Sequence, residues 1–154
     1  MLRRQPTGPC AQQGATLLEV LIAVLVLAIG LLGLASLQSA SLRFNNDAQL
    51  RTQATLLAYD VADRMRANRP EALGGAYDAA FAASACDTAF SADASQPVAA
   101  QDLAQWRNQL GCLLPLGQGS VTRVDDVVTI TVRWNERAAG DPAGVRDFVF
   151  QTRI

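Results

Sequence analysis

The feature that most constrains this chain is a run of 23 uncharged residues, from 20 to 42, between Glu19 and Arg43. A helix of that length rises about 35 Å, which is enough to cross the hydrocarbon core of a bilayer. Arg3 and Arg4 precede the run. Positive charge on that side predicts a cytoplasmic N-terminus and an exported C-terminal part.

Helical periodicity continues beyond the apolar run. Apolar residues recur at spacings of four, three, four and four, at Leu50, Ala54, Leu57, Val61 and Met65. This spacing is typical of one face of an amphipathic helix. The residue before a proline disfavours the helical conformation, so Asn68-Arg69-Pro70 is expected to end it. We therefore predict one helix over residues 16–67, with a membrane half and a half that carries a small soluble head.

The middle of the chain is less regular. Residues 71–100 are rich in Ala, Ser, Gly and Asp, which predicts a loop region with one short helical piece. Residues 100–110 predict a second helix, with Leu103, Trp106 and Leu110 on one face and Gly111 as the cap at its end. We interpret Trp106 as a core residue in preference to a surface for ligand stacking.

The last third changes to a period of two. Residues 128–134 alternate apolar and polar side chains, and 120–124 and 145–154 also predict strands. Asp125-Asp126 is expected to form a tight turn, and 135–144 a longer connection. A cation site at these two aspartates is the less favoured alternative. The expected fold is α+β: the long helix packed on a small antiparallel sheet of three to four strands.

Three cysteines, Cys10, Cys86 and Cys112, become an even pair if the N-terminal segment is removed. A Cys86–Cys112 disulfide would close a loop of roughly 25 residues and contribute about 3 kcal/mol in the chain-entropy model. Such a bond belongs in an oxidising compartment. Two unpaired buried thiols are the alternative. Cys10 as a lipid acceptor is disfavoured because no apolar region precedes it.

The chain contains no histidine, which removes the commonest general base and transition-metal ligand. We therefore expect no catalytic residues, no metal site and no cofactor. The 13 basic and 14 acidic residues nearly cancel, and no basic patch with interleaved aromatics occurs, so nucleic acid is not an expected partner.

The segment Gly14-Ala15-Thr16-Leu17-Leu18-Glu19 resembles the class III signal of type IV pilins and pseudopilins, usually written G-F-T-L-x-E. The resemblance implies that a prepilin peptidase cleaves between Gly14 and Ala15, removes residues 1–14 as a leader, and methylates the Ala15 amine. Ala15 departs from the usual phenylalanine or methionine, which bears on methylation more than on cleavage. The resemblance also implies that Glu19 pairs with the Ala15 amine of a neighbouring subunit and sets its register. An ordinary flanking charge in the headgroup region is the alternative.

The stretch Leu56–Arg69 resembles the A-Y-D-M-A-D-R-M-R-A-N segment of the PilV family of minor pilins, and the sequence around Trp106 and strand 128–134 is also similar. This implies a 15–42 transmembrane and assembly helix and a 43–154 periplasmic head. It further implies a protein of the bacterial inner membrane and then of the pilus surface. Such a protein primes assembly near the tip and supports adhesion and twitching motility.

The implied partners are other minor and major pilins, the prepilin peptidase, the inner-membrane assembly machinery and membrane lipid. A minor pseudopilin of a type II secretion system is the main alternative. A membrane-anchored periplasmic enzyme and a single-pass binding protein that keeps its leader are less favoured.

Overall fold

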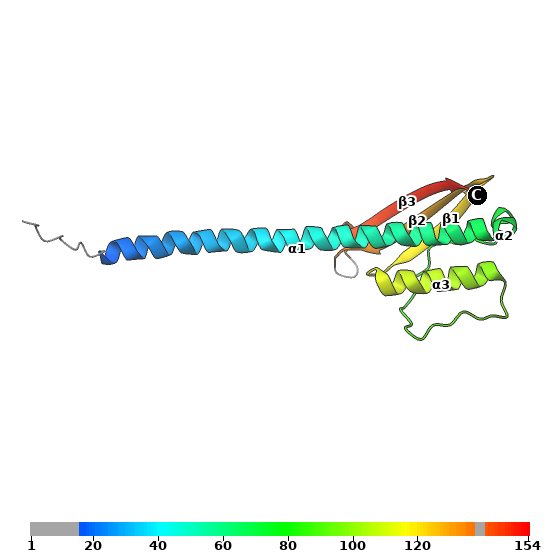
Figure 1. Cartoon of the computed structure of the whole chain (residues 1–154), viewed down its shortest axis with the longest axis horizontal. Coiled ribbons are helices and arrows are strands. Elements are labelled where there is room, and N and C mark those ends of the chain that lie inside the picture. The colour runs from blue at the N-terminus through cyan, green and yellow to red at the C-terminus, as the bar shows by residue number, and fades with distance from the viewer. Residues whose placement is uncertain (1–15, 138–140) are drawn as a thin grey trace, which may run out of the picture. The chain divides into compact units, whose positions relative to one another are not determined.

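The computed structural model of the chain describes residues 16–137 and 141–154. In chain order the elements are α1 (Leu17–Ala67), α2 (Arg69–Leu73), α3 (Val98–Leu113), β1 (Gln118–Val124), β2 (Val127–Asn135), the short 3-10 helix η1 (Pro142–Gly144) and β3 (Val145–Arg153) (Figure 1). The chain divides into two compact units, Met1–Arg43 and Phe44–Ile154. Cys10, Gly14 and Ala15, on which the leader, cleavage and methylation predictions depend, lie outside the described residues.

Helix α1 has 51 residues and matches the predicted 16–67 helix to within one residue. Its sequence has no proline, and Leu, Ala, Ile, Val, Met and Arg make up most of it. The helix ends at Ala67 as expected. However, a short helix, α2, follows directly. Asn68 occupies its N-cap position, and Pro70 lies in its first turn. Proline is favoured there because the first helical turn needs no N–H donor from that residue.

Within the second unit, α1 buries one stripe against the rest of the head. The buried side chains are Leu50, Ala54, Leu57, Ala58, Val61, Ala62 and Met65. They meet Trp106 and Leu110 of α3 and the inward residues of β2 in a single apolar cluster. The four alanine and valine positions 54, 58, 61 and 62 are fully buried, which shows that close backbone approach is part of this packing.

The three strands form one antiparallel sheet in the order β1-β2-β3, so the predicted meander is confirmed. On β2, Val128, Ile130, Val132 and Trp134 are buried and alternate with half-buried residues. This alternation follows from the two-residue period of a strand with one face on a core. The expected α+β fold, with an apolar N-terminal helix packed on a small antiparallel sheet as in type IV pilins, is therefore confirmed.

Strand β1 starts at Gln118, two residues earlier than expected, because glycine at 119 gave no apolar signal. A Cβ at Gly119 would overlap the ring of Trp106. The position is thus part of the core, and its lack of a side chain makes room for the large indole. In the sequence, the contact between Gly119 and Trp106 is visible only as an interruption of the apolar–polar alternation of the strand.

The predicted cap at Gly111 is wrong. Helix α3 continues through Gly111 to Leu113, and Leu114 is its C-terminal cap residue. A Cβ at Gly111 would overlap the carbonyl of Ser84. Glycine is needed here because the 80–97 loop crosses the helix at this point, and no helix end is involved.

Candidate functional site

Thr16 caps the first turn of α1. The Thr16 hydroxyl accepts a hydrogen bond from the backbone N–H of Glu19 (3.3 Å), and its carbonyl accepts one from the N–H of Val20 (3.2 Å). A helix N-terminus leaves several N–H groups without partners, and threonine at the cap position satisfies one of them. Thr16 and Glu19 have the threonine-to-glutamate spacing of a capping box. The described structure therefore gives Glu19 a place in a defined first turn.

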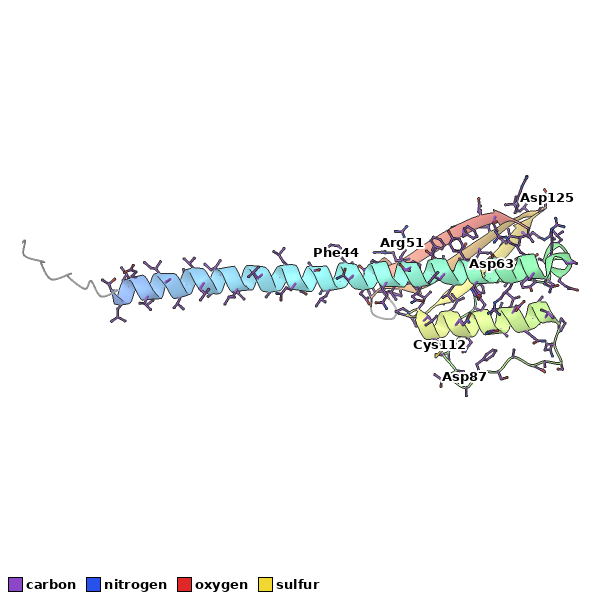
Figure 2. The ribbon with its side chains drawn as sticks, in the orientation of Figure 1. Phe44, Arg51, Asp63, Asp87, Cys112 and Asp125 are labelled. Carbon is purple, nitrogen blue, oxygen red and sulfur yellow. A yellow bond between two sulfur atoms is a disulfide. The ribbon has the colours of Figure 1, made fainter. Side chains whose placement is uncertain are left out.

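The described part of the first unit exposes apolar side chains on every side of the helix. None of residues 16–43 is buried (Figure 2). Among the described residues one helix, α1, is apolar and long enough to cross a membrane. The exposed large residues before Arg43 are Leu17, Leu18, Val20, Leu21, Ile22, Val24, Leu25, Val26, Leu27, Ile29, Leu31, Leu32, Leu34, Leu37 and Leu42. An apolar surface of this extent requires lipid or other apolar helices around it.

Glu19 is the one carboxylate on this apolar surface between residues 16 and 43. Its side chain makes no hydrogen bond or ion pair to any residue that the structure describes. The helix dipole favours a negative charge in a first turn. In an apolar surrounding, however, a carboxylate is costly unless it is neutralised or paired.

In the second unit, one polar network joins α1 to α3. The Arg64 guanidinium donates to Asp60 Oδ2 (3.0 Å), Asp102 Oδ1 (3.1 Å) and Gln105 Oε1 (3.0 Å). Asp60 and Asp102 come from different helices, so a single arginine connects them. Charge-assisted hydrogen bonds of this kind are stronger than neutral ones. The network orients α3 against the buried stripe of α1.

Tyr77 extends this network into the core. Its hydroxyl donates to Asp102 Oδ2 (2.6 Å) and accepts from Asn68 Nδ2 (3.3 Å), and its side chain is fully buried. Burial, followed by the hydrogen bond to Asp102, raises the pKa of Tyr77 to about 12. The ionised phenolate is disfavoured because it would be desolvated and would face a carboxylate.

Sequence reasoning missed this network, although the signal was present. Asp60, Arg64 and Asn68 recur every four residues within the Leu56–Arg69 stretch, and all three contribute to it. Residues four apart lie on the same helix face. The Leu56–Arg69 stretch therefore supplies a polar stripe beside the apolar one.

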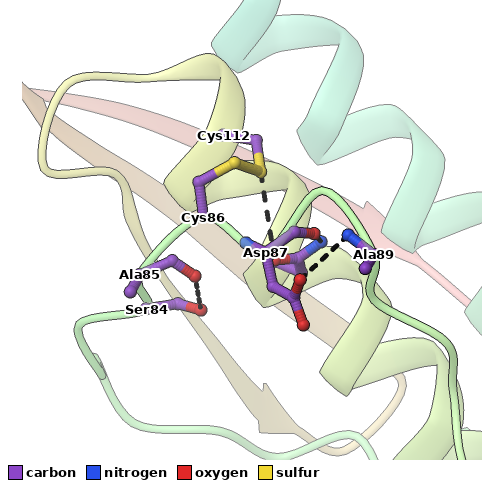
Figure 3. Close-up of a disulfide and its surroundings, with 7 residues drawn as sticks. Ser84, Ala85, Cys86, Asp87, Ala89 and Cys112 are labelled. Atoms are coloured by element: carbon purple, nitrogen blue, oxygen red, sulfur yellow. Dashed lines mark hydrogen bonds between the residues drawn. A yellow bond between two sulfur atoms is a disulfide. The ribbon is translucent and has the colours of Figure 1, made fainter.

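Cys86 and Cys112 form a disulfide that ties the long loop to the end of α3 (Figure 3). The neighbouring Asn108 side chain holds the same loop twice: it accepts from the Asp87 N–H (2.8 Å) and donates to the Asp87 carbonyl (2.9 Å). The Asn108 amide thus bonds both the N–H and the C=O of Asp87, as the backbone of a neighbouring strand would. The disulfide and Asn108 together fix an otherwise irregular and exposed segment.

The other candidate residues have structural surroundings. The Trp106 indole N–H donates to the Leu57 carbonyl (2.9 Å) in a buried environment, so the core interpretation is correct. Asp125 takes a positive φ of 54° in the two-residue turn between β1 and β2. Asp126 pairs with Arg153 (3.4 Å). Among the described residues, no group of three or more His, Cys, Asp or Glu has a metal-binding arrangement.

Arg133 and Asp147 form an ion pair on the outer face of the sheet. Arg133 donates to both oxygens of Asp147 (2.7 and 2.8 Å), and its guanidinium lies 4.3 Å from the centre of the Phe81 ring. The hydrogen bond to Arg133 lowers the pKa of Asp147, and the same contact raises the pKa of Arg133. The bidentate geometry locks neighbouring strands β2 and β3 at this position.

Comparison with known proteins supports the motif at the N-terminus. Residues 10–35 match the family model of the prokaryotic N-terminal methylation motif. The matched range includes Gly14, Ala15 and Glu19 and the first part of α1. Searches of curated proteins and of solved structures gave no match to the chain. The motif indicates a type IV pilin-like or pseudopilin-like protein that a prepilin peptidase processes and that associates with other pilins.

Proposed function

We propose that this chain is a minor pilin of a type IV pilus, stored in the bacterial inner membrane and incorporated with other minor pilins to prime assembly. The observation that carries the proposal is the match at residues 10–35, placed directly before and within a helix whose first part is wholly exposed and apolar. A methylation motif joined to a pilin-like fold is typical of a structural subunit. We therefore assign no catalytic activity to the chain.

Processing by the peptidase would create a cationic amine that can pair with the Glu19 carboxylate. Cleavage between Gly14 and Ala15 would leave a free amine at Ala15, one residue before the capping Thr16. In a bundle of like helices, the Ala15 amine of one subunit pairs with Glu19 of its neighbour. The pairing offsets the cost of placing a carboxylate among apolar side chains, and it favours one register between adjacent helices.

Transfer from lipid into the filament exchanges one apolar surrounding for another. Van der Waals packing must then supply the attraction between helices, since lipid and leucine are equally apolar. Gly30 and Gly33 have open space where a Cβ would lie. Small residues of this kind allow close helix approach, so the 30–33 region is a natural contact between subunits.

The assignment to the pilus rests on the Leu56–Arg69 stretch. Its resemblance to the PilV family favours a minor pilin with roles in adhesion and twitching motility. A minor pseudopilin of a type II secretion system would share the motif, the helix and the head. The two are separated by the apparatus that takes up the protein, so the distinguishing readout is presence in sheared surface filaments.

The first test is the intact mass of the membrane-extracted protein from cells with and without the prepilin peptidase. We expect a chain that begins at Ala15 and carries one methyl group when the peptidase is present, and the full-length chain when it is absent. A matched variant, Gly14→Leu, should remain full-length in both strains, because a side chain obstructs the approach of the enzyme. A full-length wild-type chain in both strains, or a chain cut after the apolar run, contradicts the proposal.

The role of Glu19 has its own test. Glu19→Gln keeps the size and polarity of the side chain but removes its charge. We expect normal cleavage after Gly14 and a strong loss of the protein from sheared filaments. Unchanged incorporation would assign Glu19 to the headgroup region as an ordinary flanking charge.

A further inference from the structure

Strand β3 forms an open edge of the sheet in the head. It is the outermost strand of the order β1-β2-β3 (Figure 1). Its nine residues pair with β2 in an unbroken antiparallel register, from Val145 opposite Asn135 to Arg153 opposite Val127. No described strand lies on its other side. An edge of this kind presents a row of N–H and C=O groups with which a strand from another chain can pair.

The middle of β3 directs accessible backbone groups away from the sheet. On β1, Val121 bonds to Ala79 on the side that faces away from β2 (2.8 and 2.9 Å). Antiparallel strands bond at every second residue, so the two registers make the even-numbered residues of β3 bond to β2 and turn the odd-numbered ones outward. The outward residues in the middle of the strand are Asp147, Val149 and Gln151. All three are exposed, and their N–H and C=O groups bond to no described residue.

The chain covers the other edge of this sheet but not the edge at β3. The β1 edge is bonded to Ala79, whereas β3 has no such cover among the described residues. Proteins usually protect an edge strand with a proline, a bulge or a free charge. Strand β3 contains no proline, and its register with β2 has no bulge. Each of its charged residues is paired within the head: Arg146 with Glu136, Asp147 with Arg133, and Arg153 with Asp126. The edge therefore opposes no unpaired charge to an incoming strand.

The inner face beside this edge is apolar and only partly covered. Phe148 and Phe150 pack against the core but remain half-buried. The ring of Phe150 meets Tyr59 of α1 edge-on, with 4.7 Å between the ring centres, and Tyr59 is 45% exposed. A strand added beyond β3 would place every second side chain next to these rings. The surroundings therefore suit an extended segment with apolar side chains at alternate positions.

A second copy of this chain does not fit the open edge. Tyr59 meets Phe150 and Arg66 donates to Thr152, so α1 and β3 run in the same direction within the head. Antiparallel pairing of two β3 strands would reverse one of the two α1 helices. Parallel pairing would put these helices on opposite faces of the joined sheet. Neither arrangement suits helices that share one bundle, and the β1 edge of a second copy is already bonded to its own Ala79.

We infer that the β3 edge pairs with an extended edge strand of a different pilin subunit, an inference that rests on the proposed function. Hydrogen bonds between the two backbones supply the attraction, and apolar side chains of the incoming strand next to Phe148 and Phe150 supply the specificity. The contact is heterologous, because the two subunits contribute different edges. It joins this chain to one particular neighbour, in addition to the packing between helices.

The test removes one outward N–H from the full-length chain. Val149→Pro deletes a donor that bonds to no described residue, and edge strands tolerate proline at such positions. The head should unfold at nearly the same urea concentration as in the parent chain. The amount in sheared filaments, relative to the amount processed in the membrane, should fall about fivefold, the effect of losing one typical hydrogen bond.

Val149→Thr is the matched control, because it keeps the N–H and the β-branched shape of the side chain. It should change incorporation less than about twofold, as surface substitutions usually do. Equal incorporation of Val149→Pro and Val149→Thr would overturn the inference and leave the proposed function intact.

A photo-crosslinking residue in place of Val149, whose side chain is 56% exposed, identifies the occupant directly. It also decides the case in which Val149→Pro weakens the head itself. An adduct in assembled filaments with an edge strand of a different pilin supports the inference. An adduct with a second copy of this chain, an adduct with lipid alone, or no adduct overturns it and leaves the proposed function intact. Absence of the unsubstituted, correctly processed chain from filaments overturns both the proposed function and this inference.

Discussion

The two halves of α1 reach the same backbone conformation by opposite means. From Leu17 to residue 49 no side chain is buried, and the surface is apolar on all sides up to Leu42. From Leu50 to Ala67 the helix has one buried stripe, and most of its other residues are polar. The second half is thus stabilised by contacts within the chain, whereas the first half depends on a surrounding that the chain does not supply.

This difference separates two kinds of specificity. In the second half, the identity and volume of each buried residue matter, because the head packs closely around them. In the first half, apolar residues of similar size are nearly interchangeable in lipid, and only Thr16, Glu19 and the small residues carry particular information. Substitutions should therefore affect stability in one half and insertion or assembly in the other.

The largest expected effect is a loss of stability in the head, which packs on the second half of α1. Trp106→Ala removes a fully buried indole and its hydrogen bond to Leu57, and should lower the free energy of unfolding of the head by about 3–5 kcal/mol. The measurement is urea unfolding followed by circular dichroism, with the full chain in detergent. Leu25→Ala, at a side chain that is 55% exposed in the first half, is the control and should leave the unfolding of the head unchanged. Similar losses for both variants would remove the distinction between the halves.

The next largest expected effect is a loss of membrane insertion by the first half of α1. Leu27→Arg places a charge near the middle of the apolar run and should cost about 2.5–3.5 kcal/mol of membrane insertion. Leu56→Arg makes the same change at an exposed position of the second half and should have little effect there. The measurement is the fraction of protein that stays in alkali-washed membranes. If Leu56→Arg reduced this fraction as much as Leu27→Arg, both halves would depend on lipid.

A smaller effect concerns alkaline pH and only the head. The pKa of Tyr77 is raised to about 12 in the folded state, against about 10 in the unfolded chain. Below pH 10 both states keep the proton, so the stabilisation is complete. Between pH 10 and 12 the unfolded state alone releases it, and stability should fall by about 2–3 kcal/mol. The measurement is the unfolding free energy against pH.

Tyr77→Phe is the matched variant for this pH dependence. It keeps the buried ring but cannot titrate, so its stability should vary less between pH 10 and 12 than that of the parent chain. A slope that persists in Tyr77→Phe would assign the alkaline loss to another group.

The smallest effect sharpens the description of the first turn. Thr16→Ala removes the acceptor for the Glu19 N–H and should destabilise that turn by about 1 kcal/mol. The expected result is faster amide hydrogen exchange at Glu19, with no change in the unfolding of the head. Thr16→Ser retains the hydroxyl and should behave like the parent chain. Equal exchange rates in the two variants would show that the hydroxyl does not protect this amide.

Features with a regular period were predictable from the sequence. The extent of α1, the meander of three strands and the core position of Trp106 all follow from spacings of 3.6 or two residues along one element. The motif around Glu19 was also recognisable, because its residue types and distances are local. None of these required knowledge of which elements meet.

Features that depend on contacts between distant segments were not predictable. Gly119 and Gly111 lack side chains because Trp106 and the Ser84 carbonyl occupy the space, and both contacts arise only after folding. The Arg64 network likewise combines residues from separate elements. A four-residue recurrence marks one side of the network, but no pattern in the sequence marks its partners on α3.

The positions of the core residues along the chain also determine when the core can form during synthesis. The apolar stripe of α1 ends at Met65, whereas its core partners on β2 begin at Val128. During synthesis at about 5–20 residues per second, the stripe precedes those partners by several seconds. The late-emerging meander is therefore the step that completes the head, and until then the stripe is a surface that chaperones or neighbouring chains can bind.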